Sequence, residues 1–310
     1  MKETFLIILT FVFCIGQGKA QTIEKIVVNE KDPISGYYLA VKPTSEHIDS
    51  ILVLLPGYGQ KPESIFSETK LHIIGQSNNI LTIGFTEGSK LYADENVQDA
   101  FTKILKDIIQ RYKVDKNKFV IGGFSAGGAV ALRYVELCKQ FPERFPINPT
   151  GVFTVDSPID IFWTWENLEK NFENKYSEVS VQEAEWVMNE IRKDHGVPKE
   201  NIEYYSKINP FAMNKEYGEN EKWLKNVAVR TYHDLDVAWR LKNRNQTVNQ
   251  QNFLVTSELI NRLLLMGNQG AEFMQSLDTG YRSDGTKHPH SWSIVDEKDC
   301  IDWIKKITAG

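Results

Sequence analysis

The sequence predicts an α/β protein whose mostly parallel sheet is covered by helices on both faces. Short, fully apolar runs such as residues 51–55 (ILVLL) are typical of strands that are buried on both sides. These runs alternate with segments of helical periodicity, the pattern of successive β-α units. With 41% hydrophobic and 25% charged residues, the chain of 310 residues can bury a large core and is too apolar to be disordered.

The strands begin with an antiparallel hairpin. Residues 23–28 and 37–41 are rich in β-forming side chains and flank the turn signal Lys31-Asp32-Pro33. Residues 51–55 follow and end at Pro56-Gly57. Further strands are expected at residues 80–85, 119–122, 151–155, 227–232 and 271–277.

Helices are expected between these strands. Residues 62–77 begin with a proline, which suits a first helical turn. Residues 101–112 place their apolar side chains on one face with charges between them, which is the strongest helical pattern in the chain. Two further helices are expected at residues 125–139 and 296–307.

One long segment interrupts the alternation of strands and helices. Residues 158–226 contain helical patterns, many aromatic side chains and no strong strand. We interpret them as a helical insertion between two sheet strands. Most of its aromatic residues are expected to pack this insertion onto the body of the protein, and some to form a cap over a pocket.

The N-terminus has the composition of a signal peptide. Lys2 precedes the apolar run 5–15, and small residues stand at Gly18 and Ala20 before Gln21. We therefore expect residues 1–20 to be a signal peptide, residues 21–310 to be the folded domain, and the protein to be secreted or periplasmic. Phe13 disfavours a lipid anchor on Cys14, and no later segment is long and apolar enough for membrane insertion.

The charge balance argues against one class of partner. The chain has 36 Lys and Arg residues against 41 Asp and Glu residues, a net charge of −5. No basic excess is available to neutralise phosphates, so we expect no nucleic acid partner.

The most informative motif is Gly123-Phe124-Ser125-Ala126-Gly127, which directly follows one predicted strand and directly precedes a helix. Gly-x-Ser-x-Gly in this context predicts a sharp turn that exposes the serine at the N-terminus of the helix. Backbone N–H groups and the helix dipole favour negative charge there. A phosphate-binding loop is disfavoured because Ala129, rather than lysine, follows the last glycine.

A reactive serine needs a base and an orienting acid, and in such sheets these follow in the order Ser, Asp or Glu, His. Asp234 and Asp236 come directly after the predicted strand 227–232. His288 and His290 lie in the polar loop after the predicted strand 271–277. The residues themselves leave both choices open.

The mature chain resembles an α/β-hydrolase over nearly its whole length. The elbow Gly-Phe-Ser-Ala-Gly-Gly resembles those of secreted esterases and prolyl-oligopeptidase-like enzymes, and the segment His288-Pro289-His290-Ser291-Trp292 is similar to that of secreted bacterial hydrolases. The resemblance implies Ser125 as nucleophile, Asp236 rather than Asp234 as acid, and His290 rather than His288 as base. It also implies an oxyanion hole made by the backbone amides of Tyr58 and Ala126.

The predicted function is therefore that of a secreted serine hydrolase, most simply a carboxylic ester hydrolase acting through an acyl-enzyme. The alternatives are a serine peptidase of prolyl-oligopeptidase-like type and a hydrolase-fold binding protein without activity. The aromatic insertion suggests a small-molecule or sugar-linked ester substrate. We expect no metal or organic cofactor, since Asp284, His288 and His290 alone make a weak metal site.

The remaining histidines and cysteines are expected to be structural. His47, His72, His195 and His233 are interpreted as surface or packing residues. The resemblance places Cys138 and Cys300 on opposite faces of the sheet, too far apart for a disulfide. The oligomeric state is left open by the sequence.

Overall fold

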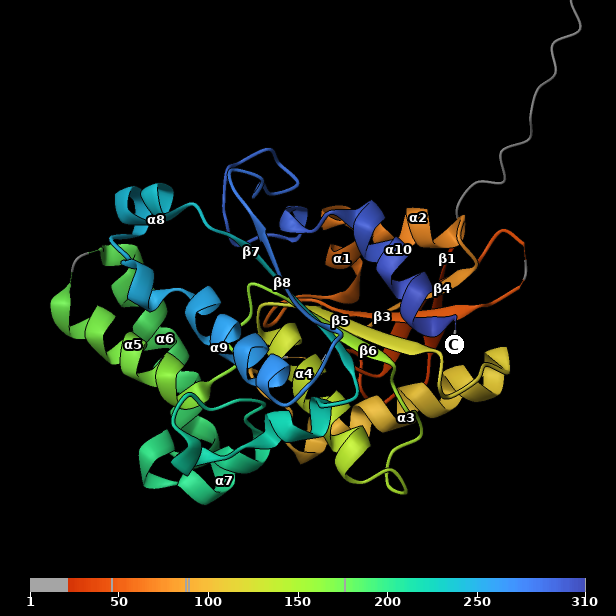
Figure 1. The fold of residues 1–310 in the computed structure, drawn as a ribbon, viewed down its shortest axis with the longest axis horizontal. Helices are drawn as coiled ribbons and strands as arrows, with labels where there is room; N and C mark the ends of the chain where they lie inside the picture. The colour runs from red at the N-terminus through yellow and green to blue at the C-terminus, as the bar shows by residue number, and fades with distance from the viewer. Residues whose placement is uncertain (1–21, 46, 87, 89, 176, 310) are drawn as a thin grey trace, which may run out of the picture.

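A mixed sheet of eight strands forms the centre of the molecule (Figure 1). The computed structural model describes residues 22–45, 47–86, 88, 90–175 and 177–309. The predicted signal peptide, residues 1–20, therefore lies outside the described residues. The spatial order is β1-β2-β4-β3-β5-β6-β7-β8, and the strands are β1 (Ile23–Val27), β2 (Tyr37–Val41), β3 (Ser50–Leu55), β4 (Ile80–Gly84), β5 (Phe119–Phe124), β6 (Gly151–Val155), β7 (Ala228–Asp234) and β8 (Ala271–Ser276).

The expected hairpin and the expected parallel sheet are both present. β1 pairs antiparallel with β2, and β2 pairs antiparallel with β4. All other neighbouring strands are parallel. In the hairpin turn, the carboxylate of Asp32 accepts the backbone N–H groups of Ile34 and Ser35. The carboxyl ends of the parallel strands consequently meet along one edge of the sheet, where such folds place their ligands.

Helices cover both faces of the sheet. One face packs against α3 (Glu95–Tyr112), α4 (Ala126–Gln140) and α9 (Asn252–Leu265), and the other against α1 (Pro62–Glu68), α2 (Leu71–Gln76) and α10 (Glu297–Thr308). Cys138 is buried on α4 and Cys300 on α10, in different hydrophobic clusters, and both are free thiols. The expectation that they do not form a disulfide is confirmed.

The segment between β6 and β7 is helical. It contains α5 (Ile161–Asn174), α6 (Glu178–His195) and α7 (Ile202–Ile208), and its described residues include no strand. Phe162, Trp165 and Tyr205 are buried in a hydrophobic cluster of their own beside the sheet. Figure 1 shows these helices as a group at one side of the molecule, next to α8 (Val237–Arg244).

Two local features differ from expectation. The helix predicted over 62–77 is divided into α1 and α2 at Thr69, which adopts extended backbone dihedrals. The Thr69 hydroxyl and the Lys70 amide both donate to the carboxylate of Glu297, so a contact with α10 fixes the break. The helices α8 and α9 between β7 and β8 were not predicted.

None of the helices in the described part of the chain has the length and apolar character that a membrane span requires.

Candidate active site

The turn between β5 and α4 holds Ser125 in a strained conformation. Ser125 has φ 54° and ψ −125°, a region that residues other than glycine rarely occupy. A Cβ at Gly123 would lie 2.2 Å from the carbonyl oxygen of Gly127, and one at Gly128 would lie 1.9 Å from Ser157 Oγ. Only glycine fits at these two positions, so the motif produces the sharp turn that the sequence predicted.

His290 lies between a buried carboxylate and the pocket that contains Ser125. Its Nδ1 is 2.8 Å from Asp156 Oδ2. Because a carboxylate only accepts hydrogen bonds, Nδ1 carries the proton and Nε2 is left as an acceptor. The imidazole also packs against Phe124, with ring centroids 4.5 Å apart. His290 and Ser125 both line one pocket, so a serine and an oriented base face the same space.

Asp156 is the first residue after β6, and its surroundings keep it ionised. The side chain is buried, and the residue has a positive φ of 43°. Arg240 Nη2 donates to Asp156 Oδ2 at 2.7 Å, and His233 Nδ1 lies 3.4 Å from Oδ1. Burial alone would raise the pKa of Asp156, but Arg240, His290 and His233 together hold that pKa well below its usual range.

Asp236 does not contact His290, so its assignment as the acid partner of the imidazole was wrong. Asp236 caps the N-terminus of α8 by accepting the N–H of Trp239 at 2.9 Å, and it forms an ion pair with Lys287 at 2.6 Å. The Lys287 hydrogen bond lowers the pKa of Asp236. His290 is paired with Asp156, because the ring points toward the end of β6 rather than the end of β7.

Asp234, the other candidate acid, has a structural environment. Its carboxylate accepts the backbone N–H groups of Asp278, Thr279 and Gly280 at 2.8–3.0 Å. These bonds attach the start of the loop that carries His290 to the end of β7. Asp234 therefore anchors the histidine loop without contacting the imidazole.

His288 lies beside His290 and has different partners. Its Nδ1 accepts the backbone N–H of His290 at 3.1 Å, and its Nε2 lies 3.1 Å from Arg244 Nη2. Burial, followed by the nearby positive charges, lowers the pKa of His288 to about 3. The ring is neutral at physiological pH and is not paired with a carboxylate.

The pocket around Ser125 has a volume of about 220 Å³. The insertion and α8 contribute the indoles of Trp163, Trp186 and Trp239 to its wall. Tyr58 and Ala126, the residues expected to supply the oxyanion donors, also line it. The structure thus brings together four of the five predicted site residues and leaves out Asp236.

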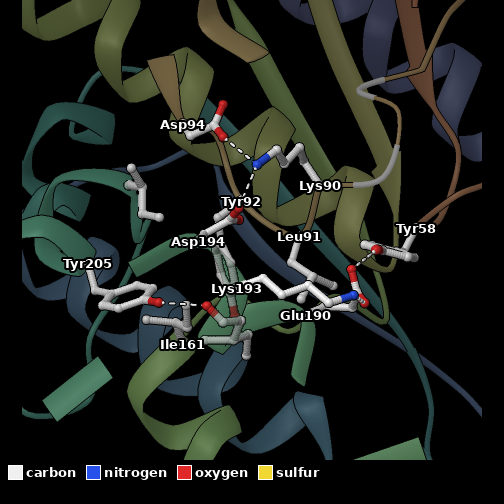
Figure 2. A pocket seen from close by; sticks show the side chains of 12 residues that line it. Tyr58, Lys90, Leu91, Tyr92, Asp94, Ile161, Glu190, Lys193, Asp194 and Tyr205 are labelled. Atoms are coloured by element: carbon white, nitrogen blue, oxygen red, sulfur yellow. Dashed lines mark hydrogen bonds and ion pairs between the residues drawn. The ribbon is translucent and has the colours of Figure 1, made fainter. Parts of the chain in front are cut away.

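A second, smaller cavity of about 70 Å³ adjoins this pocket and shares Tyr58, Leu91, Tyr92 and Ile191 with it. Figure 2 shows Lys90 between two carboxylates, Asp94 at 3.0 Å and Asp194 at 2.9 Å. Tyr58 donates to Glu190 on α6 at 2.9 Å, and Glu190 also pairs with Lys193. Each of these charged side chains has an oppositely charged partner, and the contacts of Glu190 hold the Tyr58 loop to the insertion.

No cluster of three or more His, Cys, Asp or Glu side chains in the described residues could hold a metal ion. The weak candidate of Asp284, His288 and His290 is not such a cluster: Asp284 accepts the N–H of Thr286, while His290 bonds to Asp156.

Sequence reasoning missed two residues of this site, Asp156 and Arg240. A signal existed for Asp156, because it directly follows the strand 151–155, which pairs with the strand of the serine motif. Arg240 gave no signal, since its contact depends on an unpredicted helix. His233 is a packing residue as expected: it is buried and stacked on Phe273, and it also faces Asp156.

Comparisons with known proteins support the fold. No protein-family model and no curated protein sequence matches the chain. Similar solved structures include carboxyl esterase 2 from the fungus Tuber melanosporum, with a TM-score of 0.56, 14% identity, and coverage of 95% of this chain and 87% of that chain. MPT51 of Mycobacterium tuberculosis has a TM-score of 0.55, 10% identity, and coverage of 94% and 99%.

An esterase/lipase from an uncultured bacterium is also similar, with a TM-score of 0.54, 10% identity, and coverage of 94% of this chain and 86% of that chain. At such identities the likeness establishes the fold and not the activity. Together with the sheet order and the strained turn at Ser125, it identifies the chain as a protein of the α/β-hydrolase fold.

Proposed function

We propose that the chain is a secreted serine hydrolase that cleaves carboxylic esters, with Ser125, His290 and Asp156 as its catalytic triad. The observation that carries the proposal is His290, which bonds to a buried carboxylate on one side and lines the pocket of Ser125 on the other. A strained serine, an oriented imidazole and an ionised acid are the groups that acyl transfer requires.

The chemistry follows from these positions. His290 Nε2 takes the proton of Ser125 as Oγ attacks the acyl carbon, and Asp156 stabilises the imidazolium that forms. The backbone N–H groups of Ala126 and Tyr58 are proposed to hold the oxyanion. The imidazolium returns its proton to the leaving alcohol, an acyl-enzyme remains on Ser125, and water activated by His290 then releases the acid.

The pocket favours a substrate with flat or ring-shaped parts. Indoles at Trp163, Trp186 and Trp239 line it, and they are accompanied by amide side chains such as Asn167 and Gln246. Aromatic faces and amides bind rings and hydroxyl groups, which supports a small-molecule or sugar-linked ester. We keep the sequence-based proposal of export, which N-terminal sequencing of the processed protein would test: it should begin at Gln21.

The function is tested with a panel of aryl and sugar esters, matched amides and short peptides. Ser125→Ala should lower kcat for every substrate by about 10⁶-fold while its circular dichroism spectrum stays unchanged. We expect the wild-type protein to cleave esters faster than amides. Faster cleavage of peptides would favour the peptidase alternative, and hydrolysis retained in Ser125→Ala would contradict the proposed mechanism.

A further inference from the structure

Two arginines of α8 stand one helical turn apart and face the reactive pocket. Arg240 and Arg244 both line the pocket that contains Ser125 and His290. Their spacing of four residues places them on the same side of the helix. Their side chains are 13% and 24% exposed, so both guanidinium groups are largely removed from water.

The two guanidinium groups are neutralised to different extents. Arg240 has a buried counter-charge in Asp156, 2.7 Å away. Arg244 has Glu183 at 3.7 Å, a carboxylate whose side chain is 56% exposed, and such a pair contributes little. Its nearer neighbour, His288 at 3.1 Å, is uncharged at physiological pH. Glu183 is the only acidic side chain among the described residues that line the pocket.

Hydrogen-bond donors remain available on this wall. Arg240 Nε has no acceptor among the described residues, but this atom is closed to the pocket, so the donors that a ligand can reach are those of Arg244, whose side chain is 24% exposed. The planar fork of Arg244 matches the geometry of a carboxylate, which can accept two parallel hydrogen bonds.

In the neighbouring cavity the charged side chains are paired with one another. There Lys90 lies between Asp94 and Asp194, and Glu190 has both Lys193 and Tyr58 as partners (Figure 2). Each of these charged groups has an oppositely charged partner within hydrogen-bonding distance. The reactive pocket instead has two guanidinium groups against one exposed lining carboxylate, with Asp156 neutralising only Arg240.

We propose that the natural ester carries a carboxylate group, which Arg244 binds in the reactive pocket. This inference rests on the proposed ester hydrolysis and adds the substrate class. Arg244 binds the anion, and the indole of Trp239, which packs 5.0 Å from His288, contacts the uncharged part of the substrate. The reaction needs no further reagent, because the carboxylate is a recognition group and takes no part in bond breaking.

Two matched pairs of esters test the inference. In the first pair, 3-acetoxybenzoate and 3-acetoxybenzamide, the charge lies on the alcohol part. In the second, mono(4-nitrophenyl) adipate and 4-nitrophenyl hexanoate, it lies on the acyl part. The quantity measured is the ratio of kcat/KM for the charged ester to kcat/KM for the neutral ester, because comparing this ratio between variants cancels differences in intrinsic reactivity.

We expect Arg244→Gln to lower this ratio by about 10- to 100-fold in at least one pair, as loss of a charged hydrogen bond implies. Arg244→Lys, which keeps the charge but not the planar fork, should retain part of the preference. Lys242→Gln removes the same charge from an exposed position on the same helix and should leave the ratio unchanged.

A second measurement separates this inference from the proposed function. Calorimetric binding of 3-hydroxybenzoate and adipate should be detectable in the wild type and weaker in Arg244→Gln by a similar factor. Carboxylate binding without hydrolysis of any ester would refute the proposed function and support the anion site. Ester hydrolysis with the same ratio in the wild type and Arg244→Gln would overturn the inference and leave the proposed function standing.

Discussion

The ends of β6 and β7 both present aspartates at the same edge of the sheet, but the two ends have different surroundings. After β6, Asp156 is buried against Arg240, His233 and His290. At the end of β7, Asp234 accepts three backbone N–H groups, and Asp236 caps a helix and pairs with Lys287. The partners brought by other elements, rather than the offset from the strand, decide which carboxylate meets the imidazole.

The two regions nevertheless act on one site. Asp234 holds residues 278–280 to β7 and so anchors the loop that leads to His290. Asp236 begins α8, the helix that carries Arg240 back to Asp156. The end of β6 orients the imidazole directly, and the end of β7 supports the two segments that surround it. Replacing each aspartate should therefore have a different effect on activity and stability.

The largest expected difference in kcat lies between the variants Asp156→Asn and Asp236→Asn. Asn at 156 removes the charge that stabilises the imidazolium and allows the wrong tautomer of His290, so kcat should fall about 10⁴-fold. Asn at 236 still caps α8 and loses only a partly exposed ion pair, so activity should stay within about 5-fold. Steady-state kinetics on one activated ester measure both. A larger loss of kcat in Asp236→Asn than in Asp156→Asn would identify Asp236 as the acid partner of His290.

A second difference, in the pH dependence of kcat/KM, is expected when Arg240 is replaced. Removing the guanidinium in Arg240→Gln takes away an influence that lowers the pKa of Asp156, while burial, which raises it, remains. The pKa of Asp156 therefore rises, the carboxylate takes up a proton at higher pH, and the acid limb of the kcat/KM profile should move to higher pH. The other titratable groups facing Asp156, His233 and His290, are retained in this variant.

Arg240→Lys serves as the matched control, since it keeps the positive charge near Asp156. Its acid limb should lie closer to that of the wild type than the limb of Arg240→Gln does. Coinciding profiles for all three proteins would show that Arg240 does not control the ionisation of Asp156.

A third difference concerns stability and is expected for Asp234→Ala. This change leaves the N–H groups of Asp278, Thr279 and Gly280 without their acceptor, which should lower the free energy of unfolding by about 1–3 kcal/mol. Urea unfolding measures the loss. Asp236→Asn, measured in parallel, should be nearly as stable as the wild type, and equal destabilisation would remove the distinction between the two residues.

The sequence predicted the parts of the fold that depend on local pattern. Apolar runs marked the strands, and the glycines around Ser125 marked the turn, because each signal lies within a few neighbouring residues. His290 was favoured over His288 by resemblance, and its contact with Asp156 agrees with that choice. Asp156 was missed because one carboxylate after a strand resembles any turn residue. Its role depends on contacts with residues more than 80 positions away.

In the proposed mechanism, Ser125 is an activated nucleophile supported by Asp156. The most direct measurement is intact mass after treatment with a fluorophosphonate, followed by peptide mapping. We predict one adduct on Ser125, formed at a similar rate in the wild type and Asp236→Asn and far more slowly in Asp156→Asn. No adduct on the folded protein, or equal rates in Asp156→Asn and the wild type, would contradict the account.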